Sequence, residues 1–72
     1  MITIKNIRHR VIEVIKNSGL TQVELSRRLN IKHQNISQYL KGESLPSLDT
    51  LANLCQILDV SADYILCLSN DI

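Results

Sequence analysis

The sequence of 72 residues contains no tryptophan or phenylalanine, and its only aromatic residues are Tyr39 and Tyr64. Because 44% of the residues are nevertheless hydrophobic, an aliphatic core is expected. No hydrophobic run approaches the length of a membrane-spanning helix, and the first ten residues lack the hydrophobic block of a signal peptide. We therefore predict a cytoplasmic protein with a single domain over residues 1–72, near the lower size limit for a chain that buries its own core.

Residues that carry catalytic or metal chemistry are also scarce. The histidines and cysteines are His9, His33, Cys55 and Cys67, and they lack the short, regular spacing of a metal site. No glycine-rich phosphate loop, carboxylate pair or cysteine–histidine arrangement can be assembled from the sequence. The cysteines lie among apolar residues at helical spacing, so packing as small hydrophobes is favoured over a disulfide bond. We expect no enzymatic activity, no metal or other cofactor, and no small-molecule ligand.

Basic residues are absent from the second part of the chain. All eight lysines and arginines lie within residues 1–42, where the only acids are Glu13 and Glu24. Residues 43–72 contain the other five acids. A positively charged part suits a polyanion, and a negatively charged part suits solvent or another protein. Chance clustering in a short chain is the alternative interpretation.

Apolar residues recur at helical spacing, and no alternation is long enough for a β-strand. A first helix is expected within residues 3–17 and ends before Gly19, which can adopt the left-handed conformation. Its inward stripe consists of Ile4, Ile7, Val11, Val14 and Ile15. Thr21 and Glu24 have the spacing of a capping box for a second helix, which ends near Leu29.

Three further helices are predicted after a tight turn at Asn30, a residue that tolerates the left-handed conformation. The third helix covers residues 32–41 and is closed by Gly42. Ser47 and Ser61 are candidate caps of the fourth and fifth helices. The inward residues of these two helices are expected to be Leu48, Leu51, Leu54, Cys55 and Leu58, followed by Tyr64, Ile65 and Leu68. The result is an all-α chain whose second and third helices form a helix-turn-helix.

The third helix, from the segment KHQNISQYLKG, has an unusual polar face. At about 100° per residue, one arc contains His33, Gln34, Ser37 and Gln38, and the opposite arc contains Ile36, Tyr39 and Leu40. A helix that only covers a core usually exposes glutamate and lysine. Glutamine can form two hydrogen bonds with adenine, lysine can donate to guanine, and serine can bond several base edges. The candidate base-reading residues are therefore Lys32, His33, Gln34, Ser37 and Gln38. A solvated face that happens to lack acids is the alternative.

Several short motifs, in this order and spacing, resemble the Cro/phage-repressor type of helix-turn-helix domain. The resemblance covers residues 19–66, and its most specific pieces are LTQVEL, the Ile36–Ser37 pair, KG at the end of the third helix, and LDVSADYIL. It implies a compact five-helix, lambda-repressor-like bundle that inserts its third helix into the major groove to regulate transcription. The leading hypothesis is a sequence-specific DNA-binding regulator. The alternative is a protein-interaction module, such as an antitoxin or scaffold, that binds a partner through its acidic second part.

The resemblance also implies contacts with the phosphates of double-stranded DNA. Gln22 matches the glutamine that opens the second helix in the family and touches the backbone, and the amino end of a helix favours an anion. Asn35 flanks the base-reading arc and Lys41 lies at the end of the third helix, so both are predicted phosphate ligands. Arg10 and Arg28 are weaker candidates, because exposed arginines usually only increase solubility.

Four residues depart from the family pattern. Glu43 stands where the family often has a basic residue, and it would repel a phosphate. Lys32 replaces the usual serine or threonine, so a helix cap is exchanged for a charge that reaches a base or a phosphate. Ile15 and Leu40 stand where family members often have an arginine and a glutamate that form an ion pair. Because both polar partners are absent together, we predict that these two side chains touch. The alternative is that Ile15 contacts a different neighbour.

A homodimer on a twofold operator is expected, because one helix contacts too little sequence for useful selectivity. The half-sites of such an operator are about 34 Å apart. The last stretch, YILCLSNDI, has more apolar residues than one helix can bury in a small core. Leu66 and Ile72 are the preferred dimer contacts, although a mobile tail would explain Ile72 equally well.

Overall fold

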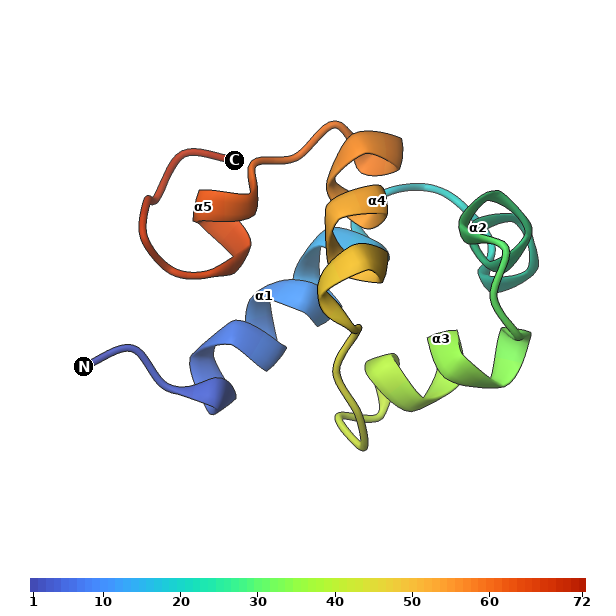
Figure 1. Ribbon diagram of the computed structural model, residues 1–72, viewed down its shortest axis with the longest axis horizontal. Helices are drawn as coiled ribbons and strands as arrows, with labels where there is room; N and C mark the ends of the chain where they lie inside the picture. The colour runs from blue at the N-terminus through green and yellow to red at the C-terminus, as the bar shows by residue number, and fades with distance from the viewer.

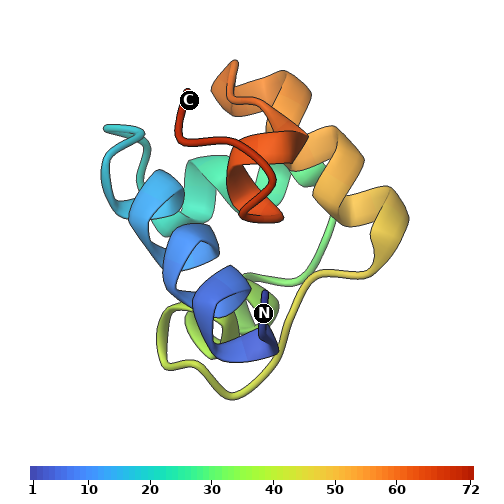
Figure 2. The same cartoon turned by 90° about the vertical axis from the view of Figure 1, so that its left-hand side faces the viewer.

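The computed structural model describes all 72 residues and consists of five α-helices without strands, as predicted. The helices are α1 (Ile4–Lys16), α2 (Gln22–Leu29), α3 (His33–Leu40), α4 (Leu48–Leu58) and α5 (Ala62–Ile65). α3 packs on α2 and on α1, α5 packs on α1, and α4 contacts both α2 and α5 (Figure 1). Both chain termini lie on the side of the molecule opposite α2 (Figures 1 and 2). None of the helices is both long and apolar enough to span a lipid bilayer.

Side-chain caps and left-handed residues define several of the helix boundaries. Thr21 caps α2, because its hydroxyl oxygen accepts from the backbone N–H of Glu24 at 3.1 Å. The same hydroxyl donates to the Glu24 carboxylate at 3.2 Å. Asn30 ends α2 in the left-handed conformation with φ of 56°. Ser61 caps α5 by accepting from the backbone N–H of Tyr64 at 3.4 Å. The predicted caps at Thr21 and Ser61 and the left-handed turn at Asn30 are confirmed. The capping box is only half formed, because the Glu24 carboxylate accepts from the Thr21 hydroxyl instead of the Thr21 backbone N–H.

The start of α4 differs from the prediction. Ser47 precedes the helix, but its hydroxyl forms no hydrogen bond with the free backbone N–H groups. It donates instead to the Asp49 carboxylate at 2.6 Å, and the Thr50 N–H donates to the same carboxylate at 2.9 Å. Both hydrogen bonds lower the pKa of Asp49, and the bond from Ser47 has the larger effect. Asp49 therefore binds a free N–H of the first turn, where its charge also interacts favourably with the helix dipole.

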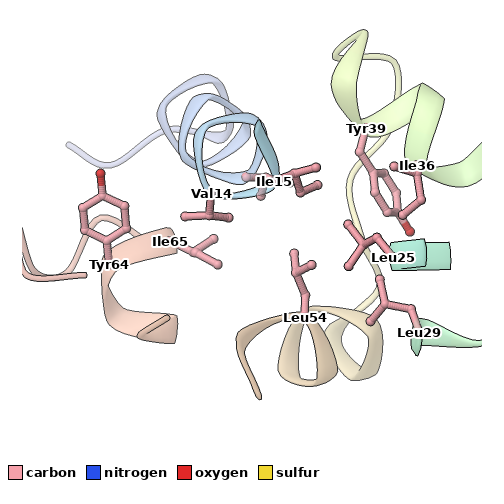
Figure 3. Close-up of a cluster of buried hydrophobic side chains, with 10 residues drawn as sticks. Val14, Ile15, Leu25, Leu29, Ile36, Tyr39, Leu54, Tyr64 and Ile65 are labelled. Atoms are coloured by element: carbon pink, nitrogen blue, oxygen red, sulfur yellow. The ribbon is translucent and has the colours of Figure 1, made fainter. Parts of the chain in front are cut away.

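The core is aliphatic except for the two tyrosines. Val14 lies beside Ile65 at the α5 end, whereas Ile15 points toward Tyr39 on α3 (Figure 3). Leu54 of α4 is fully buried between these two parts. The buried cluster comprises Val11, Val14, Ile15, Leu25, Leu29, Ile36, Tyr39, Leu54, Tyr64 and Ile65. Complete burial of one large aliphatic side chain is worth about 1.5–3 kcal/mol. This cluster is therefore the main source of stability, and it includes residues of all five helices.

Three side chains predicted to face inward are exposed. The exposed fractions are 55% for Ile4, 85% for Leu48 and 65% for Leu68. Ile4 and Leu48 are the first residues of their helices, and helical side chains point back toward the amino end. Their side chains therefore extend beyond the amino end of each helix, where the core no longer covers them. Leu68 lies beyond α5, which ends at Ile65 after a single turn.

Arg10 of α1 holds the C-terminal segment in place. Its guanidinium donates to the backbone carbonyls of Tyr64 at 2.7 Å and Ser69 at 2.6 Å. It also donates to the Asn70 side-chain oxygen at 3.0 Å and lies 4.2 Å from the centre of the Tyr64 ring. The Tyr64 hydroxyl donates to Glu13 at 2.6 Å, and this bond raises the pKa of Tyr64. Because these contacts occupy its guanidinium, Arg10 is not retained as a phosphate candidate.

Candidate nucleic-acid interface

α3 is anchored on the core by one face and exposes the other. Ile36 is fully buried and Tyr39 is only 6% exposed, so these two side chains fix the rotation of the helix about its axis. His33, Gln34 and Gln38 are all exposed on the opposite side. Packing of the apolar arc therefore presents these three hydrogen-bonding side chains to solvent.

Two lysines flank α3. Lys32 is the N-cap residue and Lys41 is the C-cap residue, so the helix is one residue shorter at each end than the predicted range 32–41. Both side chains are exposed. Lys32 forms no side-chain cap, as expected for an ammonium group that has no acceptor. The first N–H groups of α3 thus keep no side-chain partner, and both ends of the exposed face carry positive charge.

The turn between α2 and α3 is held by backbone hydrogen bonds. The Asn30 N–H donates to the Arg27 carbonyl at 3.1 Å, and the Ile31 N–H donates to the Ser26 carbonyl at 3.0 Å. Ile31 is half-buried against the core cluster. These bonds close the end of α2, and α3 packs directly on α2, so the two helices form one packed unit.

Gln22 and Ser37 meet across this unit. The Ser37 hydroxyl donates to Oε1 of Gln22 at 2.9 Å, and both side chains are half-buried. A predicted phosphate ligand is thus in contact with a predicted base-reading residue, and Ser37 turns from the exposed arc toward the start of α2. Sequence reasoning missed this bond, because helical periodicity relates residues within one helix and these two lie 15 positions apart on different helices.

The remaining phosphate candidates lie at the edge and end of α3. Asn35 is half-buried on its flank, and Lys41 is exposed after its last turn. Gly42 then adopts φ of +75°, and a Cβ there would lie 3.2 Å from Cδ of Arg8, so the chain turns tightly against α1. Glu43 follows and is exposed. Its carboxylate places negative charge in the loop that follows α3.

No group of three or more histidine, cysteine or acidic side chains is arranged to hold a metal ion. Cys55 and Cys67 are free and half-buried rather than fully buried. Burial raises the pKa of the Cys55 thiol. A raised pKa reduces the fraction of the nucleophilic thiolate form.

The two predicted dimer contacts lie in different places. Leu66 is half-buried and lines an apolar groove of about 150 Å³ between α1, α4 and the loop that follows α3. The groove is also lined by Ile4, Ile7, Leu45, Leu48 and Leu51. Ile72 is 63% exposed and borders a separate, more polar hollow beside the last turns of α1 and α4.

Five packed helices, a two-helix unit joined by a tight turn, and an exposed polar face on the second helix of that unit define a helix-turn-helix protein. The comparison of sequences agrees with this architecture. The sequence model of the helix-turn-helix family matches residues 11–65, and the chain belongs to that family.

The chain is similar to several bacterial regulators. It is 39% identical over 57 residues to the HTH-type transcriptional regulator ImmR of Bacillus subtilis (strain 168), covering 79% of this chain and 45% of that protein. It is 36% identical over 61 residues to the HTH-type transcriptional regulator for conjugative element R391 of Providencia rettgeri. That match covers 85% of this chain and 28% of the relative. It is 34% identical over 62 residues to the uncharacterized HTH-type transcriptional regulator YobD of Bacillus subtilis (strain 168). That match covers 86% of this chain and 55% of the relative.

These relatives are transcriptional regulators rather than enzymes. The chain spans about half or less of the length of the relatives it matches, so the similarity concerns their helix-turn-helix part. Among the solved structures, none matches this chain significantly.

Proposed function

We propose that this chain is the sequence-specific DNA-binding module of a transcriptional regulator and that α3 enters the major groove of double-stranded DNA. The observation that carries the proposal is the exposed face of α3, where His33, Gln34 and Gln38 stand opposite the buried Ile36 and Tyr39. The similarity of the chain to HTH-type transcriptional regulators supports the same function.

In the proposed complex, base contacts and phosphate contacts come from different parts of the surface. Gln34 and Gln38 each offer a donor and an acceptor that match adenine, and His33 can donate to a purine acceptor. Lys32 reaches a guanine or a phosphate from the start of α3. The phosphate contacts that set the register of the helix come from Gln22, Asn35 and Lys41.

The first test is selection of bound sequences from a pool of random duplexes, followed by titration of the selected duplex at several salt concentrations. We expect a defined consensus and an affinity that falls steeply with salt, because each phosphate contact releases counterions with a logarithmic slope of about −0.9. Failure to enrich any sequence, together with co-purification of a partner protein, would instead support a protein-interaction module that acts through the acidic second part.

We further propose that the module binds its operator as a homodimer, with Leu66 and the apolar groove at the interface. The groove contains Leu48, whose side chain is 85% exposed at its edge. In a twofold pair the same patch meets itself, so Leu48 of each copy can enter the groove of the other. Ile72 remains the second candidate contact, on the separate hollow beside α1 and α4.

Replacing Leu48 by glutamate should leave the fold intact, because the side chain is exposed, and should shrink the footprint on a twofold operator to one half-site. Ile72→Glu introduces the same charge at another exposed apolar residue and serves as the matched variant. DNase footprinting at saturating protein measures the result. If wild-type protein covers only one half-site, the dimer on DNA is refuted. If only Ile72→Glu shrinks the footprint, the interface lies at Ile72.

A further inference from the structure

The Ser37 hydroxyl is used differently from the hydroxyls of Ser18 and Ser26, which also lie on or beside helices. Ser26 donates to the Val23 carbonyl of its own helix at 2.8 Å, and Ser18 donates to the Ile15 carbonyl just before it at 2.7 Å. Such local bonds are the usual choice for serine in or next to a helix. Ser37 donates instead to the Gln22 side chain on another helix. Its only proton is therefore committed to a side chain at the start of α2.

This bond fixes which end of the Gln22 amide faces outward. A glutamine amide has one acceptor oxygen and two donor hydrogens, whereas a phosphate oxygen can only accept. Because Oε1 of Gln22 accepts from Ser37, its NH₂ group is left free to donate. A flipped amide would present its oxygen to the phosphate, and two acceptors repel each other. The half-buried position of both residues further restricts the rotation of the amide.

We propose that Ser37 is a positioning residue, which holds the Gln22 amide ready to donate to a backbone phosphate and so ties that phosphate contact to the reading helix. The inference rests on the proposed DNA-binding function. The inference removes Ser37 from the base-reading residues and assigns it to the phosphate contacts, which are made with every DNA sequence alike. With its proton used, Ser37 retains only acceptor capacity and cannot donate to guanine.

A double-mutant cycle on DNA affinity tests this role. Ser37→Ala should weaken the selected duplex and a random duplex by the same factor, about 3- to 10-fold, the range of one neutral hydrogen bond. Gln22→Ala should lower the affinity at least as much, and the double variant should be no weaker than Gln22→Ala alone. Ser37→Thr keeps the hydroxyl and should restore most of the affinity. Ser26→Ala removes a hydroxyl that bonds only within its own helix, and it should leave affinity unchanged.

Two results would overturn the inference. Losses from Ser37→Ala that appear at particular base pairs only would return Ser37 to the base-reading residues. If the fold-losses of affinity from Ser37→Ala and Gln22→Ala multiply in the double variant, the two effects are independent, and Ser37 does not act through Gln22. Wild-type protein that binds no duplex would refute the proposed function and this inference with it, whereas wild-type binding with independent variants would refute this inference alone. The side-chain amide signals of Gln22 in ¹⁵N spectra provide a second measurement without DNA, because they should become more mobile in Ser37→Ala. Unchanged mobility would also count against the role of Ser37.

Discussion

Replacing Ile15 by arginine is expected to lower the free energy of unfolding by about 3–5 kcal/mol, the cost of an unpaired charge in a buried site. Ile15 is only 4% exposed and points from α1 toward Tyr39 on α3 (Figure 3). Leu40→Glu should destabilise less, because Leu40 is half-buried against the core cluster. If the two side chains touch, as predicted, the introduced charges can pair. The double variant should then be about 0.5–3 kcal/mol more stable than the sum of the single effects.

Urea unfolding of the four proteins measures this coupling. Val14→Arg combined with Leu40→Glu is the matched control, since Val14 is equally buried but lies beside Ile65 at the α5 end (Figure 3). The control pair should show no recovery. Equal coupling in both pairs, or none in either, would contradict a contact between Ile15 and Leu40. If a charged variant does not fold, the milder cycle of Ile15→Val and Leu40→Ala tests the same contact.

Removing both glutamines from the exposed face of α3 is expected to abolish most of the sequence preference. Gln34→Ala and Gln38→Ala should each cost about 1–3 kcal/mol on the selected duplex and relax the preference at particular base pairs. Binding to a random duplex should change little, because these side chains point at base edges in the proposed complex. Titration of both duplexes with each variant measures the difference.

Two further variants complete that experiment. Lys41→Ala should weaken all duplexes alike and reduce the salt slope by about 1, as expected for a lost phosphate contact. Gln56→Ala removes an exposed glutamine of α4 that is not among the proposed DNA contacts, and it should have no effect. Equal losses on selected and random duplexes for Gln34→Ala and Gln38→Ala would remove both residues from the base-reading set.

The amino-acid sequence by itself determined the order of the five helices and most of the residues that they bury. Caps at Thr21 and Ser61 and the left-handed turn at Asn30 depend on residues within three or four positions, so local chemistry was sufficient to predict them. Helical periodicity likewise separated the buried Ile36 and Tyr39 from the polar arc of α3. The candidate interface followed because one short helix contains both its anchor and its exposed face.

Only the tertiary structure decided where the helices end relative to the core and which distant side chains meet. The exposure of Leu48 depends on how far its neighbours extend past the start of α4, which periodicity does not encode. Arg10 bonds to residues 54 to 60 positions away, and its role as a clamp on the C-terminal segment required α1 and α5 to be in place. The bond between Ser37 and Gln22 likewise exists only because packing on the shared core brings the start of α2 beside α3. Such contacts are set by the relative placement of separate helices, and that placement depends on the burial of the whole core rather than on any local stretch of residues.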